Sequence, residues 1–311
     1  MNEPVIRLSG VTKRYGAFTA VDDLSFSVDR GAIYGFLGQN GAGKTTTLRM
    51  LMDIVPPTSG TVRVLGADRP RQVRARVGYL PEERGLYKKM RAADSIAYFA
   101  RLKGVPGGQA KAKANELLDR FGLGDFARSK IEALSKGMAQ KVQLLSVIAH
   151  DPELLILDEP FSGLDPVNQQ VLEDMILELR AGGRTIVFST HVMAHAERLC
   201  DRFLMVAHGA CVFEGTLADA RAADGDAQVL TTPDAVGALR EHPAVAALTA
   251  LGQDRYAVAP APDADGQAVL AACLALGIRV AGFGRRATSL HDLFFRLAGA
   301  DAPTAPITEA A

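Results

Sequence analysis

The sequence has little of what would tie a protein to nucleic acid or to an oxidising compartment. Lys and Arg together number 35, as do Asp and Glu, so the formal net charge of +0 gives no bulk attraction for a polyanion. We therefore expect no nucleic-acid partner. The 3 cysteines are an odd number without C-x-x-C spacing, which argues against a disulfide framework or a zinc site. We expect Cys200, Cys211 and Cys273 to be core residues of a cytosolic protein.

Long hydrophobic runs are also missing. The longest apolar stretch, residues 268–278, is far shorter than the roughly 18 residues that a membrane helix needs. Residues 1–10 lack the basic start and the apolar segment of a secretory signal. We predict a cytoplasmic protein that does not cross a bilayer by itself, so a role at the membrane would require a partner.

What the chain does contain is an α/β pattern. Its 311 residues, 48% of them hydrophobic, suffice for about two domains. Between residues 5 and 214, short apolar runs alternate with helical spacing, which predicts a mainly parallel sheet. Alternation near the start predicts an antiparallel β subdomain, and residues 86–150 read as an inserted helical lobe. The elements expected here are strands 5–11, 24–28, 33–37, 154–158 and 185–189 and helices 44–52, 95–102, 110–121 and 138–149.

The character of the sequence changes after residue 215. We divide the chain into domains 1–224 and 225–300 and a tail, 301–311, whose prolines and few apolar residues predict disorder. The order strand–helix–strand–strand–helix–strand predicts a small α+β domain of the ferredoxin-like kind. A last helix begins at a capping box, Ser289 to Asp292, and places Leu290, Leu293, Phe294 and Leu297 on one stripe. The expected elements are strands 228–231, 245–251, 255–258 and 278–283 and helices 217–223, 233–241 and 267–276.

A glycine-rich loop follows strand 33–37 and opens helix 44–52. This is the context that a phosphate-binding P-loop requires, because curled backbone N–H groups and a helix N-terminus attract phosphate oxygens. Lys44 is expected to reach the β- and γ-phosphates, and the Thr45 hydroxyl to ligate Mg²⁺. A glycine turn with an incidental lysine is the alternative, which the strand and helix context disfavours. The predicted nucleotide-binding residues are Gly38, Gln39, Asn40, Gly41, Ala42, Gly43, Lys44, Thr45 and Thr46.

Two carboxylates end the apolar strand 154–158. Asp158 is expected to hold Mg²⁺, and Glu159 to orient or deprotonate the water that attacks the γ-phosphate. By itself the pattern is equally consistent with a strand followed by an acidic turn at a proline. The P-loop upstream favours the catalytic interpretation.

Residues 134–138, Leu-Ser-Lys-Gly-Met, complete a set of motifs that resembles the nucleotide-binding subunit of an ATP-binding cassette (ABC) transporter. In that family this signature segment forms a second anion site, so the resemblance implies that Ser135 and Gly137 bind the γ-phosphate of ATP held by another copy. It therefore implies a head-to-tail homodimer. Lys136 and Met138 depart from the family's commonest glycine and glutamine, in a form typical of one branch of exporters.

Smaller elements follow the same resemblance. Tyr15 is similar to the aromatic residue that stacks on adenine, although it also fits an ordinary tyrosine at a strand edge. Residues 161–165 match the loop that reaches the opposing P-loop. His191, at the end of strand 185–189, matches the histidine that contacts the γ-phosphate and is expected to act in catalysis with Glu159 and Lys44. His195 has the spacing of a helical metal pair with His191, but no third ligand is evident, and we expect it to be a solvated helix residue.

Glu82 stands where the family usually has a glutamine. A carboxylate can contact Mg²⁺ or the attacking water but cannot donate a hydrogen bond. We therefore expect Glu82 to be a further Mg²⁺ residue with Thr45 and Asp158. Residues 84–90 combine cations with apolar side chains. They fit a docking site for a helix of another protein or, alternatively, a solvated charged loop.

The resemblance implies an ATPase subunit of an exporter, with a C-terminal domain like those of sodium- and drug-exporter subunits. ATP and Mg²⁺ are the expected cofactors, and a separate transmembrane permease is the expected partner. The subunit would lie peripherally on the inner face of the cell membrane. A non-transport ABC ATPase and a regulatory subunit are the alternatives. The first usually carries two cassettes or a long coiled coil, neither of which is present in this sequence.

Overall fold

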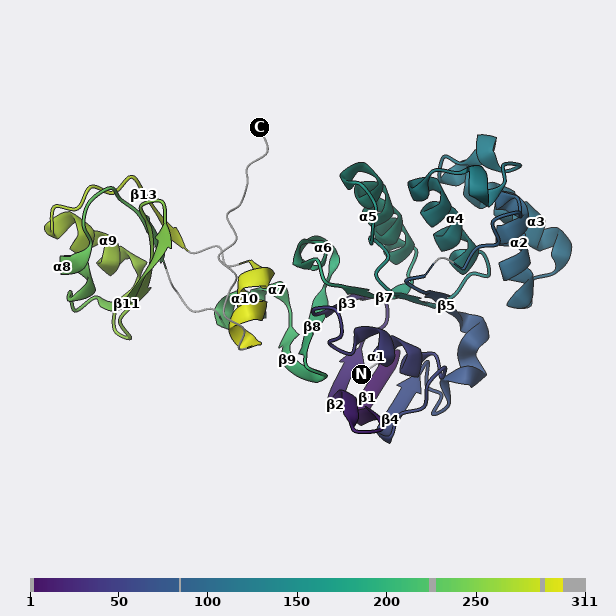
Figure 1. The fold of residues 1–311 in the computed structure, drawn as a ribbon, viewed down its shortest axis with the longest axis horizontal. Coiled ribbons are helices and arrows are strands. Elements are labelled where there is room, and N and C mark those ends of the chain that lie inside the picture. Colours follow the sequence, from purple (N-terminus) through teal and green to yellow (C-terminus); the bar gives the residue numbers. More distant parts are fainter. Residues whose placement is uncertain (1–2, 84, 224–227, 286–288, 299–311) are drawn as a thin grey trace. The chain divides into compact units, whose positions relative to one another are not determined.

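The computed structural model describes residues 3–83, 85–223, 228–285 and 289–298. The chain divides into two compact units, Met1–Thr216 and Leu217–Ala311 (Figure 1). The boundary expected after residue 224 and the tail 301–311 lie outside the described residues.

A six-stranded sheet forms the centre of the first unit. Its strands are parallel except the last, which pairs with its neighbour in the antiparallel direction. In spatial order the strands are β5 (Val77–Leu80), β6 (Leu154–Leu157), β7 (Thr185–Thr190), β3 (Ile33–Leu37), β8 (Arg202–Ala207) and β9 (Ala210–Gly215). Cys211 lies on the edge strand β9 and is exposed, so its predicted place in the core was wrong.

An antiparallel sheet of three strands packs against one face of the central sheet (Figure 1). Its strands are β2 (Phe18–Val28), β1 (Ile6–Tyr15) and β4 (Ser59–Val64), in that order. The N-terminal hairpin is longer than the alternation predicted, because β1 and β2 pair as far as Tyr15 and Phe18. Helix α1 (Lys44–Leu51) lies between the two sheets and shares their core.

The other face of the central sheet carries α2 (Ala92–Leu102), α3 (Gly107–Arg120), η2 (Gly124–Phe126), η3 (Ile131–Ala133), α4 (Lys136–Ile148), α5 (Pro166–Ala181) and α6 (Met193–Leu199). Helix η1 (Pro70–Arg76), between β4 and β5, packs instead through Val73 with α1 and the antiparallel sheet. Helices α2, α3 and α4 pack together as the predicted helical lobe. None of the helices in the described part of the chain is long and apolar enough to span a bilayer.

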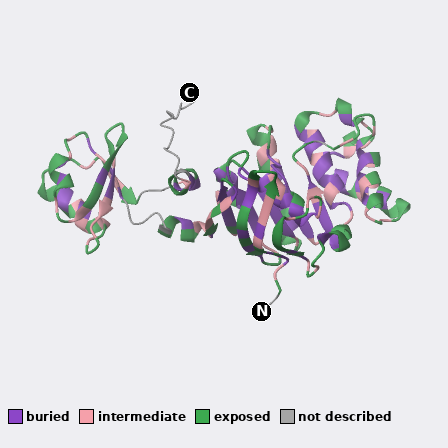
Figure 2. Cartoon of the chain, turned by 60° about the horizontal axis from the view of Figure 1, so that its bottom comes forward, coloured by how far each residue is buried: buried purple, intermediate pink, exposed green. Residues whose placement is uncertain are grey.

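Strands β3, β6 and β7 of the central sheet are buried on both faces (Figure 2). Within β6, Leu154 and Ile156 pack toward α1 and the antiparallel sheet, whereas Leu155 and Leu157 pack toward the helical lobe. Alternate residues of β3 and β7 divide in the same way. Two-sided burial explains why these strands appear in the sequence as continuous apolar runs.

The second unit contains a four-stranded antiparallel sheet in the order β11 (Val245–Gly252), β12 (Arg255–Pro260), β10 (Gln228–Thr231), β13 (Gly282–Arg285). Its helices are α7 (Leu217–Ala223), α8 (Gly237–Arg240), α9 (Gly266–Ala275) and α10 (Leu290–Leu297). Helix α8 is a single turn, shorter than the expected helix 233–241, and β13 starts four residues later than predicted. Ser289 caps α10 as expected, accepting a hydrogen bond from Asp292 N.

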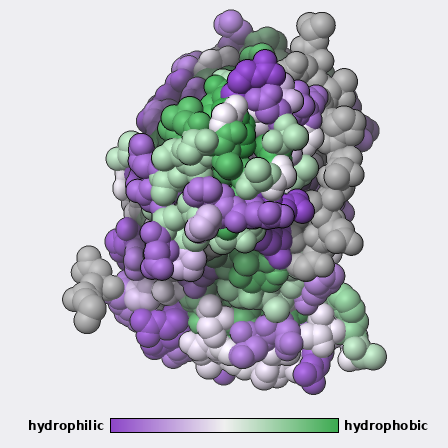
Figure 3. Space-filling view, turned by 90° about the vertical axis from the view of Figure 1, so that its left-hand side faces the viewer, coloured by the Kyte–Doolittle hydropathy of each residue, from purple (hydrophilic) through white to green (hydrophobic). Residues whose placement is uncertain are grey.

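Several apolar side chains of this unit remain at its surface, where Figure 3 shows green patches among charged residues. Leu274 on α9 is 64% exposed, and Leu251 and Leu276 are also exposed. In α10, Leu290, Leu293 and Phe294 of the predicted stripe are buried, while Leu297 is not.

Candidate functional site

The glycine-rich loop connects β3 to α1 at the carboxyl edge of the central sheet. Gly43 has φ +101°, and a Cβ there would lie 2.4 Å from the Ala20 carbonyl oxygen. Gly38 is equally restricted, because a Cβ would approach the Val206 carbonyl oxygen to 2.4 Å. Both glycines are therefore needed for the loop to pack against its neighbours, which leaves its backbone curled at the start of α1.

Lys44 is buried at the base of this loop. Its Nζ donates hydrogen bonds to the carbonyl oxygens of Gly38 at 2.8 Å and Gln39 at 3.2 Å. The same atom lies 3.1 Å from Glu159 Oε1, with both side chains about 95% buried. The loop thus holds the ammonium group beside the acidic end of β6, as the sequence predicts for a phosphate-binding lysine.

Asp158 lies directly beside the start of α1. Its Oδ1 accepts hydrogen bonds from Thr45 Oγ1 at 3.2 Å and from Ser189 Oγ at 2.6 Å. Burial raises the pKa of Asp158, although the hydrogen bonds from Ser189 and Thr45 act in the opposite direction. Hydroxyl and carboxylate oxygens at this spacing form a donor set of the kind that Mg²⁺ prefers.

Glu159 occupies a strained turn after β6. Its φ of +46° is unusual for a residue with a side chain, and its N–H donates to Ser189 Oγ at 2.9 Å. Its second carboxylate oxygen, Oε2, lies 2.9 Å from Nδ1 of His191, whose ring is 47% exposed. The carboxylate therefore bridges Lys44 and His191, two residues that the sequence assigned to the same site.

A cleft of about 440 Å³ opens above these groups. Its lining includes Glu82, a predicted Mg²⁺ residue, together with Phe18, an aromatic residue that belongs to none of the sequence motifs. Phe18 is paired with Tyr15 across the tip of the β1–β2 hairpin. Tyr15 itself does not line the cleft, and its ring lies 5.0 Å from Lys13 Nζ. The full lining is Phe18, Ala20, Asn40, Gly41, Gly43, Lys44, Thr45, Thr46, Glu82 and Glu159.

The signature residues lie at the start of α4, outside this cleft. Ser135 is the N-cap of that helix, and its Oγ accepts a hydrogen bond from Met138 N at 3.2 Å. Gly137 packs so closely against Asn168 that a Cβ would lie 2.4 Å from its side chain. Within one chain, Ser135 and Gly137 are not among the residues that surround Lys44 and Thr45.

His195 is buried, which corrects the expectation of a solvated residue. Only 1% of the residue is exposed, because its ring packs against Phe161 and its Nδ1 lies 2.7 Å from Glu173 Oε1. No group of three or more His, Cys, Asp or Glu residues suited to a metal ion occurs in the described residues. The helical metal pair considered for His191 and His195 thus gains no further ligand.

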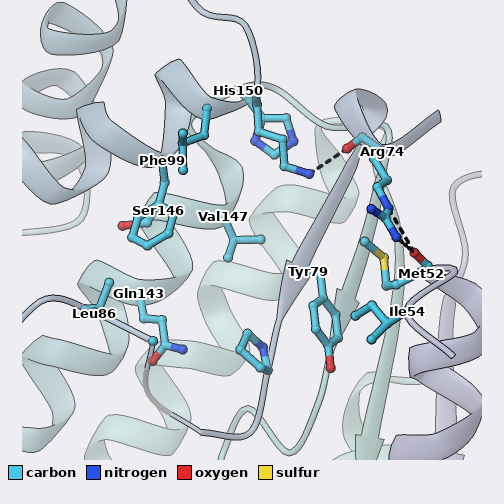
Figure 4. Close-up of a pocket in the computed structure, with 14 residues that line it drawn as sticks. Met52, Ile54, Arg74, Tyr79, Leu86, Phe99, Gln143, Ser146, Val147 and His150 are labelled. Carbon is cyan, nitrogen blue, oxygen red and sulfur yellow. Dashed lines mark hydrogen bonds between the residues drawn. The ribbon is translucent and has the colours of Figure 1, made fainter. Parts of the chain in front are cut away.

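A second, apolar groove lies between the sheet and the helical lobe (Figure 4). It has a volume of about 370 Å³ and is bordered by Tyr79 and Leu86 and by helix residues such as Phe99 and Val147. Two cations line it, but both donate to backbone carbonyls: Arg74 to Met52 O and Lys103 to Arg74 O. Burial and the nearby Lys103 lower the pKa of His150, at one side of the groove, to about 4, so this imidazole is neutral near pH 7.

Comparison with known proteins agrees with this geometry. Residues 21–162 match the model of the ABC transporter family. The chain is 37% identical over 297 residues to an uncharacterized ABC transporter ATP-binding protein, YhaQ, of Bacillus subtilis (strain 168), covering 95% of this chain and 99% of the relative. The chain belongs to the ATP-binding subunits of ABC transporters. Such a subunit binds and hydrolyses ATP, and the P-loop cleft of this ABC subunit has the residues for that activity.

Other relatives of this ABC subunit support the same assignment. It is 40% identical over 218 residues to Nod factor export ATP-binding protein I of Paraburkholderia xenovorans (strain LB400), covering 69% of this chain and 72% of the relative. A solved ATP-binding subunit of an ABC transporter superposes with a TM-score of 0.64 at 33% identity, covering 71% of this chain and 93% of that one. The likeness to an export protein is consistent with the exporter-type branch that the signature segment indicated.

Proposed function

We propose that two copies of this ABC subunit close head to tail on two ATP molecules and thereby drive a separate permease of an exporter. The observation that carries the proposal is the meeting of Lys44, Thr45, Asp158, Glu159 and His191 at one edge of the sheet. These five side chains come from three separate segments of the chain. Together they bring an ammonium group, two oxygen ligands for a metal ion, a carboxylate base and an imidazole to one place.

Phosphate binding rests on the loop and Lys44. The curled backbone N–H groups of residues 38–46 would hold the phosphate oxygens, and Lys44 would turn from its carbonyl and Glu159 partners to the β- and γ-phosphates. Asp158 and Thr45 fit Mg²⁺, with Glu82 across the same cleft as a further carboxylate. When bound, Mg²⁺ would neutralise charge on the β- and γ-phosphates.

Hydrolysis would be assisted by Glu159. Its carboxylate faces the cleft from the end of β6 and would orient the attacking water and accept its proton. His191 contacts the same carboxylate while nearly half of its ring remains exposed, so it is placed to donate a hydrogen bond to the γ-phosphate. This arrangement supports catalysis mainly by positioning and charge stabilisation, as phosphoryl transfer requires.

The dimer is proposed because the signature residues and the P-loop do not share a cleft within one chain. Ser135 and Gly137 stand at the N-terminus of α4, where unpaired backbone N–H groups favour an anion. A second copy in head-to-tail orientation would bring these groups to the γ-phosphate bound by the first. ATP would then act as the link between the copies.

The permease is proposed to dock a helix in the apolar groove. This groove joins residues 85 and 86 of the predicted docking segment to the helical lobe, and several of its apolar side chains are exposed. Leu102 is 63% exposed there, and Ile54 is 53% exposed. Binding to a membrane-embedded permease would hold the subunit at the cytoplasmic face of the membrane.

The second unit is proposed to be a ferredoxin-like accessory domain. Its order of elements, from β10 to β13, and its sheet order support this fold. We further propose that residues 1–224 act as the ATPase domain and residues 225–300 as the accessory domain.

Replacing Glu159 with Gln tests the proposed mechanism. The amide preserves the shape of the side chain but cannot accept a proton, so turnover is expected to fall by about 10²-fold or more. ATP binding should persist, and size-exclusion chromatography with light scattering should show an ATP-dependent dimer. A Glu159→Gln variant that hydrolyses ATP normally, or that stays monomeric with ATP bound, would contradict the proposal.

A further inference from the structure

Phe161 links the catalytic turn to a buried polar cluster that the proposed mechanism does not use. It follows Glu159 by two residues and is 3% exposed. Its ring packs edge-on against Phe188 of β7, with centroids 5.8 Å apart, and lies nearly parallel to the imidazole of His195, with centroids 4.1 Å apart. The position of this turn therefore depends on an imidazole carried by α6.

The imidazole is in turn held by α5. Glu173 Oε1 lies 2.7 Å from His195 Nδ1, and Arg198 makes a second, two-pronged contact with the same carboxylate. Glu173 and His195 are both at least 97% buried in their side chains. Burial lowers the pKa of His195, so the ring is neutral near pH 7 and its Nδ1–H donates to Glu173. Burial alone would raise the pKa of Glu173, but the hydrogen bonds from Arg198 and His195 outweigh it and lower that pKa.

We propose that His195 and Glu173 are positioning residues for ATP hydrolysis: the Glu173–His195 hydrogen bond fixes the imidazole, and the imidazole fixes Phe161 and the strained turn that presents Glu159. This inference rests on the proposed catalytic role of Glu159. It adds two residues that touch neither ATP nor water but set where the carboxylate lies.

The backbone at Glu159 explains why such support is needed. A side-chain-bearing residue at φ +46° persists only where its surroundings over-determine it. Besides Phe161, the turn is held by Ser189 Oγ, which accepts from Glu159 N, and by Gln140 Nε2, which donates to Pro160 O at 3.0 Å. Removing the imidazole would take away the packing on one face of Phe161.

The placement of α6 also connects the cluster to His191. This helix begins at Met193, two residues after His191, and carries both His195 and Arg198. Helix α5 begins at Pro166, directly after the loop 161–165. A shift of His191 toward the γ-phosphate would move the start of α6 and, through His195, would act on Phe161 of the Glu159 turn and on Glu173 of α5.

A buried carboxylate held by a neutral imidazole and a half-exposed guanidinium contributes little to stability by itself. Apolar residues of similar volume would fill the same space without removing charges from water, and such replacements are often neutral or stabilising. The cluster at residues 173, 195 and 198 is better explained by the fixed geometry that it imposes on Phe161.

Steady-state ATPase kinetics of His195→Ala and His195→Phe test the proposal. The alanine removes the ring, and kcat is expected to fall about tenfold, while KM for Mg-ATP stays within about twofold, because misplaced groups affect chemistry more than binding. The phenylalanine keeps a ring against Phe161 but has no N–H to donate to Glu173, so it is expected to restore only part of kcat. Wild-type kcat in His195→Ala, or a loss in His195→Phe as large as in His195→Ala, would overturn the role of the ring.

Glu173→Leu provides a test that does not open a cavity. It leaves the Nδ1–H of His195 without its acceptor, and kcat is expected to fall with KM unchanged. Glu178→Leu is the matched control, since Glu178 lies on the same helix and pairs with Arg120 at the surface. Equal kcat in Glu173→Leu and Glu178→Leu would overturn the role of the buried pair.

Glu159→Gln is measured in parallel to separate the two proposals. Normal turnover in Glu159→Gln means that the catalytic role of Glu159 is wrong. An inactive Glu159→Gln together with fully active, folded His195→Ala and Glu173→Leu means that only the positioning role is wrong. Circular dichroism of each variant establishes that it is folded before its kinetics are compared.

Discussion

Two glycines of the P-loop share a left-handed backbone conformation but differ in their surroundings. Gly41 and Gly43 both have positive φ, at +83° and +101°, which a side chain disfavours. They differ in their surroundings, because a Cβ at Gly41 would meet nothing within 4 Å, whereas one at Gly43 would meet a backbone oxygen. Position 43 therefore requires glycine because of packing as well as backbone conformation.

This difference predicts unequal effects of Gly41→Ala and Gly43→Ala. The first is expected to lower the free energy of unfolding by about 1–2 kcal/mol, the strain of a left-handed alanine. The second adds a clash with the Ala20 carbonyl and is expected to destabilise further and to weaken ATP binding by displacing the loop. Urea unfolding and titration with a fluorescent ATP analogue measure both effects. Equal losses in the two variants would show that the close approach at Gly43 has no energetic consequence.

Sequence was informative about site residues that belong to one continuous motif. Lys44 and Thr45 could be recognised because the loop, its flanking strand and its helix are adjacent in the chain. Phe18 could not be recognised in this way. It lines the cleft from the β1–β2 hairpin, and no pattern in the neighbouring sequence indicates that it lies near the P-loop. The burial of His195 was missed for a similar reason: its partners Glu173 and Phe161 come from 22 and 34 residues earlier, respectively.

At the scale of elements, the strands with two-sided burial were the easiest to predict. Strands β3, β6 and β7 begin and end within one residue of their predicted bounds. A central strand is apolar along its whole length, so its ends are clear in the sequence. The one-turn helix α8 and the late start of β13 were not predicted, because the small accessory sheet sets these boundaries through long-range pairing. Short elements owe more to their neighbours than to their own sequence.

Ion pairs at the start of β6 tie this strand to two other segments. Glu153 contacts Arg76 at the end of η1 and Arg30 before β3. Hydrogen bonding to Arg76 is the main cause that lowers the pKa of Glu153 to about 2 from a usual 4.5, with Arg30 adding to the effect. A carboxylate with a lowered pKa stabilises the folded state at pH above its unfolded pKa, and this contribution fades as the pH falls toward 2.

Glu153→Gln is therefore expected to be less stable than the parent at pH 7, by about 1 kcal/mol or less since the group is partly solvated. The difference should shrink when both proteins are unfolded by urea at pH 3. Glu116→Gln serves as a control, because Glu116 pairs with Lys113 within one exposed helix surface and links no separate segments. A difference that is constant between pH 7 and pH 3 would contradict the ion-pair explanation.

For the whole molecule, the apolar groove is the surface on which coupling to a permease would depend. Leu102→Glu places a charge on an exposed groove residue without disturbing the core. It is expected to abolish co-purification with the permease and ATP-dependent transport, while the ATPase activity of the isolated subunit stays within about twofold because Leu102 does not line the P-loop cleft. Leu177→Glu, at an exposed position of α5 outside the groove, is the control. Co-purification that survives Leu102→Glu would place the permease contact elsewhere.

The division into two units predicts how the chain tolerates truncation. The first unit has its own two-sided core, so a protein ending at Thr216 is expected to fold cooperatively and to retain ATP binding. We expect weaker dimerisation or altered regulation, because the truncation removes the accessory domain. Thermal unfolding, ATPase assays and light scattering measure these properties. A truncated chain that dimerises and hydrolyses ATP like the full chain would show that the second unit serves neither purpose.

The exposed thiol on β9 offers a practical route to watching this subunit work. Cys273 is buried and Cys200 partly so, which leaves Cys211 as the accessible thiol of the three. A maleimide dye would therefore attach chiefly at the edge strand of the ATPase sheet, on a residue that lines neither the P-loop cleft nor the groove. Energy transfer between dyes on two copies could then report the closing and opening of the pair in real time, with every native cysteine left in place.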